Sequence, residues 1–431
     1  MTSLPAPPSD VAVPLLVGRT TRLDPTSATA LLDLLPDVTD PALLTSWVRG
    51  GNGLVGWGRI AEHRSRGVDR FAQAQDWWRE VASSAVVRDE VQVPGTGPVA
   101  FGSLTFSGDS AHDSVLLVPE VVVGRRGEDA WVTTLTLAPN VPGTAVLTAQ
   151  EPPQAPISVA YTDGPLDAAG YAAAVAEAVA RIGAGDLDKV VLARSLEVLA
   201  GAPIDVRWLL QRLAQRYDNT WAFAVDGLVG ATPEMLVRLE RGLVTSRVLA
   251  GTIQRSGHDE KDLALAASLA RSSKDLEEHE YAVRSVADAL AVHTSSMNVP
   301  ESPFVLHLSN VMHLATDVTA VARPEVTSLD LAASLHPSAA VCGTPTATAG
   351  VMLAELEQMD RGRYAGPVGW MDTRGDGDWG IALRCGAYDA ADPSRMTLYA
   401  GCGIVAGSDP TSEVAESVAK FLPMREALHP R

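Results

Sequence analysis

The first third of the chain contains short apolar runs that glycine and proline residues interrupt. The runs SVLLVPEVVVG at 114–124 and WVTTLTLA at 131–138 have the length and the β-branched content of buried strands. The segment DRFAQAQDWWREVASSA at 69–85 instead spaces its apolar residues like one face of a helix. Residues 15–150 are therefore predicted to form an α/β layer, and this layer contains no obvious catalytic residue.

Prolines mark two interruptions of regular structure. Residues 1–14 contain four prolines and predict a flexible N-terminal arm. The stretch EPPQAP at 151–156 has two adjacent prolines and a third, which helices and central strands do not tolerate. We therefore divide the chain into the arm, an N-terminal part at 15–150 and a second region at 157–425.

The second region shows clear helical and strand patterns. Asp167 can cap a helix at 167–185, whose large apolar residues recur every three or four positions. The apolar run KVVLARSLEVL at 189–199 predicts a buried strand. Further strands are expected at 221–232, 235–251 and 379–389, and further helices at 259–273, 274–293 and 410–428.

The balance of charge excludes several classes of function. The chain has 34 lysine and arginine residues against 52 aspartate and glutamate residues, which gives a net charge of −18 at pH 7. A non-specific nucleic-acid binder, or a protein of anionic membrane surfaces, needs a basic face, so we expect neither kind of partner. An anionic ligand would need cations placed next to it.

The cysteines and the apolar runs bear on the compartment. Cys342, Cys385 and Cys402 are odd in number and lack CxxC or Cys/His spacing, so neither a disulfide framework nor a zinc site is expected. The N-terminus lacks the basic and then apolar layout of a signal peptide, and no run of about 18 apolar residues exists to cross a bilayer. A cytoplasmic location fits best.

Two predicted helices carry carboxylates that a hard metal ion could use. In the helix at 274–293, the spacing allows Glu278 to face the protein. In the last predicted helix, Glu413, Glu416 and Lys420 line one face. Oxygen ligands without histidine or cysteine favour Mg²⁺, which typically keeps waters and shares its shell with an anionic substrate.

Each of these helices also has a plain structural explanation. Lys274 with Glu278, and Glu416 with Lys420, are four-residue pairs, and surface ion pairs of this kind contribute only about 0.3–0.5 kcal/mol. Glu416 nevertheless follows the glycine-rich run AGCGIVAGSDP, whose backbone and following helix N-terminus suit a bound carboxylate. The pattern alone leaves both explanations open.

Three further charged residues lie next to apolar runs. Lys189 opens the strand KVVLAR, where burial would lower its pKa and provide a general base, although simple exposure explains it as well. Glu234 follows Pro233 at a turn, where a semi-buried carboxyl could stay protonated as an acid, and turn exposure is the plainer alternative. Arg384 stands in a buried-looking predicted strand, where it needs an anion such as a substrate carboxylate.

Two runs of small residues could line a compact polar pocket. They are LAGT at 249–252 and HPSAAVCGTP at 336–345. Their backbone N–H groups could contact a ligand, and tight turns explain them equally well.

Together these segments resemble the chorismate-utilising enzymes, the family of isochorismate, salicylate, anthranilate and aminodeoxychorismate synthases. The resemblance extends from about 160 to 425, always in the family order, through DKVVLAR, GATPEMLVR, LAGT, SSKDLEEHEYAV, VMHLATDV, LHPSAAVCGTP, RGRYAGPVGWMD, IALRCG and AGCGIVAGSDPTSEVAESVAK. It implies one large α+β domain like that of anthranilate synthase component I. In this fold two stacked, mainly antiparallel sheets surround the active site, helices lie outside, and residues 15–150 form the more variable part of the same unit.

The resemblance also implies roles for individual residues. Lys189 would be the general base that activates water, and Glu234 the general acid that protonates the departing hydroxyl. Glu278 and Glu416 would hold Mg²⁺, with Glu413 nearby through water. The residues implied for chorismate binding, with the tyrosine beside the enolpyruvyl group, are Gly251, Thr252, Ala340, Tyr364, Arg384, Gly401 and Lys420.

Within the family, the resemblance favours an isochorismate synthase. Glutamine-dependent relatives use ammonia and carry a different residue at the position of Lys189, so water is the expected nucleophile and no amidotransferase subunit is expected. Water would add at C2 of chorismate as the C4 hydroxyl leaves. The product could feed menaquinone or siderophore biosynthesis, and relatives of this architecture suggest a monomer.

Two alternatives use the same motifs. A salicylate synthase would share the lysine, the acid and the metal glutamates, and would then eliminate pyruvate from bound isochorismate. A non-catalytic module would hold chorismate without converting it, although the intact catalytic and metal positions argue against this. One departure concerns the last helix, where relatives read roughly EWEET and this chain reads EVAES at 413–417. Both acidic positions are kept, but the packing around them is expected to differ.

Overall fold

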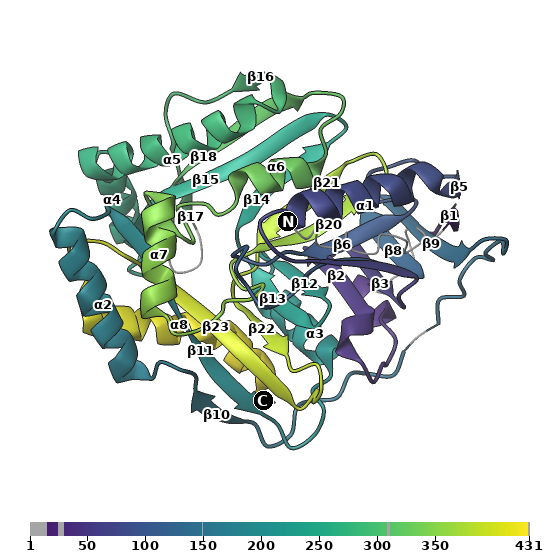
Figure 1. Ribbon diagram of the computed structural model, residues 1–431, viewed down its shortest axis with the longest axis horizontal. Coiled ribbons are helices and arrows are strands. Elements are labelled where there is room, and N and C mark those ends of the chain that lie inside the picture. The colour runs from purple at the N-terminus through teal and green to yellow at the C-terminus, as the bar shows by residue number, and fades with distance from the viewer. Residues whose placement is uncertain (1–14, 25–29, 149, 308–310, 430–431) are drawn as a thin grey trace, which may run out of the picture.

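Two large β-sheets form the body of the molecule, and helices surround them (Figure 1). The computed structural model describes residues 15–24, 30–148, 150–307 and 311–429, with the backbone alone described at 252, 274, 275, 278 and 311. The predicted arm at 1–14 lies outside the described residues. Nearly all strand pairs are antiparallel, β1 with β5 being a parallel pair, so the predicted α+β class is confirmed.

The first sheet has thirteen strands among the described residues, in the order β10-β11-β23-β22-β13-β12-β2-β3-β8-β9-β1-β5, with β19 beside β11. Its strands are β1 (Leu16–Arg22), β2 (Leu44–Arg49), β3 (Asn52–Trp57), β5 (Val86–Asp89), β8 (Val121–Arg126), β9 (Asp129–Leu137), β10 (Ala160–Asp163), β11 (Lys189–Leu199), β12 (Trp221–Val225), β13 (Leu228–Thr232), β19 (Gly343–Thr344), β22 (Cys385–Tyr388) and β23 (Arg395–Ile404).

The second sheet has ten strands among the described residues, in the order β16-β18-β15-β14-β21-β20-β6-β7-β4, with β17 beside β18. Its strands are β4 (Ala61–Ser65), β6 (Val99–Ser103), β7 (Ser114–Val118), β14 (Met235–Glu240), β15 (Leu243–Gln254), β16 (Thr294–Asn298), β17 (Phe304–His307), β18 (Val311–Ala322), β20 (Pro367–Asp372) and β21 (Gly377–Ile381). Strands from 15–150 and from 157–425 therefore occur in both sheets.

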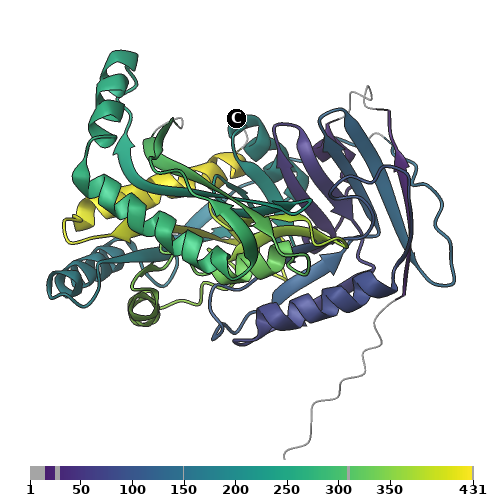
Figure 2. The same cartoon turned by 90° about the horizontal axis from the view of Figure 1, so that it is seen from above.

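The helices divide between the two sheets. Those on the first sheet are α2 (Ala168–Gly183), α3 (Val206–Arg216), α7 (Thr346–Leu356) and α8 (Pro410–Leu428). Those on the second sheet are α1 (Arg70–Ser84), α4 (Asp259–Leu269), α5 (Ser273–Ala291) and α6 (Ser328–Leu335). Two short 3₁₀ turns span Leu31–Leu34 and Pro41–Leu43. Figure 2 shows α1 along the flank of the N-terminal strands. No described helix is both long and apolar enough to cross a membrane.

A continuous apolar core joins the two sheets. Trp47 and Phe223 from the first sheet and Phe101 and Trp379 from the second sheet are fully buried within it. The Trp47 indole also donates a hydrogen bond to the Asp378 carboxylate across the interface, over 3.2 Å. Burying four large aromatic side chains removes apolar area on the scale of several hundred Å² from water, which explains why the sheets stay together.

Several elements agree closely with the sequence patterns. The strand β11 and the helix α8 have the predicted bounds, and α2 begins after its Asp167 cap, whose side chain accepts a hydrogen bond from the Gly170 N–H over 2.7 Å. The strands predicted at 221–232, 235–251 and 379–389 are each divided in the structure: tight turns separate β12 from β13 and β14 from β15, and 379–389 is divided at Arg384. Arg384 adopts a left-handed φ of +49° there, and the chain leaves β21 and enters β22 in the other sheet.

Candidate active site

Glu234 lies where the chain crosses from one sheet to the other. It belongs to the two-residue link between β13 of the first sheet and β14 of the second. Its N–H donates to the Thr232 hydroxyl over 3.2 Å, and its carbonyl accepts from the Ile381 N–H over 3.0 Å. The backbone on both sides is therefore fixed, so the direction of this half-buried carboxyl is set by the sheets.

The electrostatic surroundings of Glu234 combine burial with positive charge. Burial raises the pKa of its carboxyl above the ordinary value. Three cations are close enough to oppose that shift, with decreasing effect: Arg384, Lys189 and Lys420. These four residues were all predicted from the sequence, and the structure gathers them in one place.

Arg384 occupies the crossover next to that of Glu234. It lies between β21 and β22, and its carbonyl accepts from the Ala231 N–H over 3.2 Å. The left-handed φ is costly for a residue with a side chain, so the surrounding strands must hold it there. The guanidinium is half-buried next to a half-buried carboxyl, as an anion-binding arginine would be.

Lys189 is the first residue of β11, and it pairs with Thr344 of β19. Its side chain is half-buried and passes over Gly403 of β23, where an added Cβ would come within 3.2 Å of the lysine Cε. The glycine in AGCGIV therefore gives the lysine chain the room that any larger residue would occupy. The Lys189 side chain is therefore neither fully solvated nor fully buried.

Gly401 and Tyr364 approach each other closely. A Cβ on Gly401 would lie 2.9 Å from the Tyr364 hydroxyl, so glycine is needed for the ring to reach this position. The ring stacks on Tyr399 with centroids 5.0 Å apart, and burial raises the pKa of the Tyr364 phenol. The Gly401 carbonyl accepts from the Lys420 ammonium over 2.8 Å, which ties α8 to β23.

The helix α8 presents the predicted acidic face. Its N-cap is Asp409, whose carboxylate accepts from the Ser412 N–H over 2.9 Å. The Glu416 carboxylate lies 2.6 Å from the Lys420 ammonium, so the four-residue ion pair exists. Among the described residues, the Oε2 atom of Glu413 is buried without a hydrogen-bond partner. Ligand atoms of Glu413, Glu416 and Cys402 lie within 4.8 Å of one another.

A buried arginine fixes this helix on the sheet. The Arg194 Nε of β11 donates to the Ser417 hydroxyl over 3.1 Å, and that hydroxyl donates to the Val414 carbonyl over 2.7 Å. Arg194 also lies over the rings of Tyr171 and Phe421. Ser417, the last residue of the EVAES segment, therefore anchors the helix to the sheet.

Four predicted residues remain to be placed, and the side chains of two of them lie outside the described residues. The backbone of Gly251 has a φ of +71° at a bulge in β15, and the Thr252 side chain lies outside the described residues. The Glu278 side chain also lies outside them. Its helix α5 packs on β15 and β18, and Tyr281, on the same helical face, is exposed. Ala340 is exposed in the loop before β19.

His313 borders the site and was not predicted as a site residue. Burial lowers the pKa of its imidazole, a hydrogen bond with the Gly251 backbone opposes that shift, and Lys420 lowers the pKa further. His313 therefore contacts the Gly251 backbone and is near enough to Lys420 for that cation to affect its pKa. The motif VMHLATDV contains His313, but only the bulged pairing of β15 with β18 brings its ring to Gly251.

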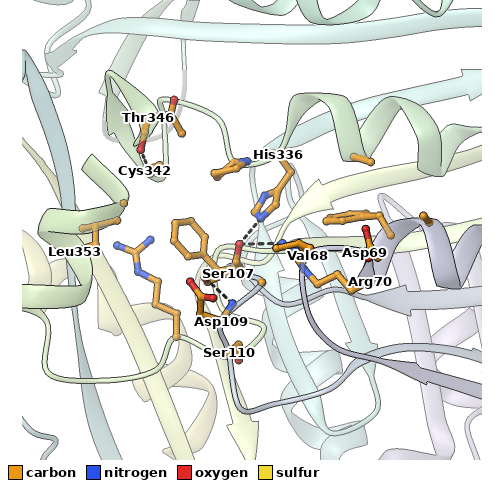
Figure 3. Close-up of a pocket in the computed structure, with 18 of the residues that line it drawn as sticks. Val68, Asp69, Arg70, Ser107, Asp109, Ser110, His336, Cys342, Thr346 and Leu353 are labelled. Carbon is orange, nitrogen blue, oxygen red and sulfur yellow. Dashed lines mark hydrogen bonds between the residues drawn. The ribbon is translucent and has the colours of Figure 1, made fainter. Parts of the chain in front are cut away.

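A separate large cavity of about 1390 Å³ opens between α1, α6 and α7 (Figure 3). Leu353 of α7 and Arg70 of α1 lie on opposite sides of it, with His336 between them. None of the residues predicted for chorismate or for the metal is among the described residues that line it. The predicted chemistry therefore belongs to the region between the sheets around Glu234.

The arrangement around Glu234 can bind an anion and transfer protons. A carboxyl whose pKa is raised by burial can donate a proton, and Lys189, which is near enough to affect that pKa, is a candidate to accept one. Arg384 and Lys420 add positive charge for carboxylates of a ligand.

Comparisons with known proteins identify the family of this chain. A family model described as chorismate binding enzyme matches residues 12–429. The isochorismate synthase DhbC of Bacillus subtilis is 40% identical over 270 residues, which cover 60% of this chain and 67% of the relative. The salicylate biosynthesis isochorismate synthase of Pseudomonas aeruginosa is 31% identical over 438 residues, which cover 96% of this chain and 90% of the relative.

A solved structure shows the same fold. MenF, the menaquinone-specific isochorismate synthase from Escherichia coli, matches with a TM-score of 0.79 at 23% identity, over 97% of this chain and 95% of that one. The match of the family model to nearly all of the sequence settles the relationship that the ordered motifs predicted. The chain belongs to the chorismate-binding enzymes.

Proposed function

We propose that this chain is an isochorismate synthase, an isomerase that converts chorismate into isochorismate. Water would add at C2 of the ring while the C4 hydroxyl leaves and the double bonds shift between them. The observation that carries the proposal is the grouping of Glu234 with Lys189, Arg384 and Lys420. The family membership and the relatives named as isochorismate synthases support it.

Glu234 is proposed as the general acid. A departing hydroxyl needs a proton, and burial favours the protonated form of this carboxyl at higher pH than usual. The neighbouring cations oppose the effect of burial on the pKa of Glu234. This balance suits a group that gives up its proton in each turnover.

Lys189 is proposed as the general base that activates water. Its position at the start of β11, half-buried over Gly403, separates it from bulk solvent on one side. The base and the acid would act at opposite ends of one allylic displacement, which needs two separately tuned groups. A lysine as base favours water over ammonia, so no amidotransferase partner is proposed.

Chorismate is the proposed substrate. It is a dianion, and a chain of net charge −18 can admit it only where local cations reverse the field. Arg384 and Lys420 are proposed to bind its carboxylates, and Gly401 provides a close backbone approach. Gly251, Thr252, Ala340 and Tyr364 remain the further proposed contacts.

Mg²⁺ is the proposed cofactor, and the donors fit a hard cation. Glu416 and Glu278 would hold it, with Glu413 contributing through water. The buried Oε2 of Glu413 has no hydrogen-bond partner among the described residues, and a carboxylate oxygen is the kind of ligand that Mg²⁺ binds. When bound, the ion would neutralise substrate carboxylate charge.

The deciding experiment incubates the purified chain with chorismate and Mg²⁺, without ammonia, and separates the products by chromatography with mass detection. A new peak of unchanged mass is expected and would identify isochorismate. Salicylate with pyruvate would instead indicate a salicylate synthase. Turnover only after ammonia is added would contradict water as nucleophile, and binding without turnover would indicate a non-catalytic module.

The wider setting is also a proposal. The three cysteines are free and buried, which supports a reducing, cytoplasmic compartment. Relatives are named for menaquinone and for salicylate biosynthesis, so the isochorismate made here could serve either branch.

A further inference from the structure

A buried ion pair outside the proposed catalytic groups joins three segments of the site. Glu357 ends α7 and Arg361 follows four residues later, and their side chains are only 3% and 4% exposed. The guanidinium Nε donates to one carboxylate oxygen of Glu357 over 2.8 Å, and one of its amino groups donates to the other. The Nε and one amino group of Arg361 therefore form a bidentate pair with the Glu357 carboxylate.

The pair contacts an interrupted edge of β11, the strand that begins with Lys189. Along this edge β19 pairs with residues 189–190, and β10 pairs only with residues 196–199. In the gap, the Ala193 N–H donates to the Glu357 carboxylate over 2.7 Å, and Arg361 donates to the Val191 carbonyl over 2.5 Å. The two side chains thus satisfy backbone groups that a neighbouring strand would otherwise satisfy.

The same arginine holds the loop that carries Ala340. Its second amino group donates to the Val341 carbonyl over 2.8 Å. The Cys342 carbonyl, one residue further, accepts from the Val191 N–H over 2.9 Å. One guanidinium therefore bonds directly to the strand of the proposed base and to the loop of a proposed substrate contact.

Tyr364 is attached to the pair as well. Its N–H donates to the Arg361 carbonyl over 3.0 Å, and the guanidinium lies 5.9 Å from its ring centroid. The Arg361 guanidinium also lies 4.3 Å from the ring centroid of Phe106. Aromatic rings on both sides leave the arginine few alternative positions.

Stability alone is a weak reason to keep such a pair. Taking two charges out of water costs free energy that their attraction only partly returns, and apolar residues of similar size often fill such sites equally well. What apolar residues lack is directed hydrogen bonds to the backbone of two segments at once, β11 and the loop at 336–342. A lysine lacks them too, because its ammonium is a point charge without the planar fork.

We propose that Glu357 and Arg361 are positioning residues that set the distance between the Lys189 base and chorismate. They do not touch the substrate in this role. They fix the spacing between β11, the loop at 336–342 and Tyr364. The proposal rests on the proposed function for its catalytic consequence, while the mechanical link between the three segments can be tested without turnover.

The experiment compares R361K with a matched control, R207K. Arg207 is also 4% exposed and pairs with a carboxylate, that of Asp205, but it lies on α3 away from the site. Chorismate turnover is measured below the melting temperature of every variant. Hydrogen exchange of the segments at 189–193 and 338–342 is measured on the same samples.

In R361K we expect kcat to fall by about 10- to 100-fold, since a misplacement of about 1 Å can cost that much, with KM changed by less than about threefold. Both segments should exchange faster in R361K, and R207K should match the wild type in kcat and in exchange. A kcat within about threefold of wild type, a loss confined to KM, or unchanged exchange in R361K would overturn the proposal.

Two further outcomes are decided by the same design. If the wild type does not convert chorismate, the proposed function fails, and the exchange data alone support or overturn the link. If R361K does not fold, E357Q replaces it, because its amide oxygen can still accept from the Ala193 N–H while the charge is lost. A wild-type kcat in E357Q, or failure of both variants to fold, would overturn a positioning role.

Discussion

Glu234 and Arg384 lie in adjacent crossovers, and each carbonyl accepts a hydrogen bond from a residue next to the other crossover. Ile381, three residues before Arg384, donates to the Glu234 carbonyl over 3.0 Å, and Ala231, three residues before Glu234, donates to the Arg384 carbonyl over 3.2 Å. The carboxyl and the cation that acts most strongly on it are therefore held by the backbone of both sheets. Their separation should change little when side chains elsewhere are replaced.

Replacing Glu234 by glutamine should abolish most turnover without unfolding the protein. The amide keeps the shape but cannot deliver a proton, and loss of a general acid typically costs about 10²- to 10⁴-fold in kcat. The melting temperature should not fall, because the variant no longer buries a carboxyl. The matched control is Glu197→Gln, an exposed carboxylate on β11 that bonds to Thr397 and should retain wild-type kcat. Wild-type kcat in E234Q would remove this residue from the mechanism.

The raised pKa of Glu234 also predicts two pH effects. The folded protein holds this proton more tightly than the unfolded chain, so the contribution to stability is full below the ordinary carboxyl pKa and is lost as pH rises through the raised value. Activity should also fall as pH rises through the raised pKa of Glu234, because the general acid then loses its proton. Melting curves against pH for wild type and E234Q test the first effect, and their difference should shrink toward low pH. A difference that grows as pH falls would contradict the direction of the shift.

Much of this fold could be predicted because the elements that carry it have a regular period. β11 and α8 have the predicted bounds, since an apolar strand and a capped helix with proline at its first turn are local patterns. The links in which the chain crosses from one sheet to the other have no regular spacing of apolar residues. The sequence around Arg384 reads as one apolar strand, and only the packing of two sheets forces the left-handed turn that divides it.

Contacts in the site between residues far apart in the sequence could not be predicted from sequence patterns either. The family motifs located the residues around Glu234, but His313 reaches Gly251 only through the bulge between β15 and β18. Glu357 and Arg361 have the four-residue spacing of a surface helix pair, yet both are buried. Spacing along the chain cannot tell a solvated pair from one that bonds to a distant strand edge.

Replacing Lys189 by alanine should abolish turnover while leaving the fold intact, because the residue begins a strand whose backbone pairing does not need its side chain. Circular dichroism and the melting temperature should stay close to wild type while product formation is lost. Exposed Lys261 on α4 provides the matched control, K261A, which should keep full activity. Product formation at the wild-type rate by K189A would exclude lysine as the base.

The glycine beneath that lysine gives a finer test. A Cβ at Gly403 would meet the lysine Cε at 3.2 Å, so G403A should push the flexible side chain aside by a few tenths of an ångström with little loss of stability. Because proton transfer depends on position, we expect kcat to fall by about 10-fold. G407A is the control, since a Cβ there meets nothing within 4 Å. Equal kcat in the two variants would show that the position of the lysine does not limit the rate.

Metal dependence separates the two explanations of the acidic face on α8. If Glu416 is a ligand, EDTA should stop the reaction, Mg²⁺ should restore it, and E416Q should need much more Mg²⁺ for the same rate. The exposed pair with Lys420 contributes only about 0.3–0.5 kcal/mol, and the substitution also relieves repulsion with Glu413, so the melting temperature of the metal-free variant should hardly change or should rise. Titrating Mg²⁺ should raise the melting temperature of wild type more than that of E416Q, because a ligand that binds the folded state stabilises it. A large fall in the melting temperature of E416Q, with unchanged Mg²⁺ dependence, would instead show that Glu416 serves the helix and not the metal.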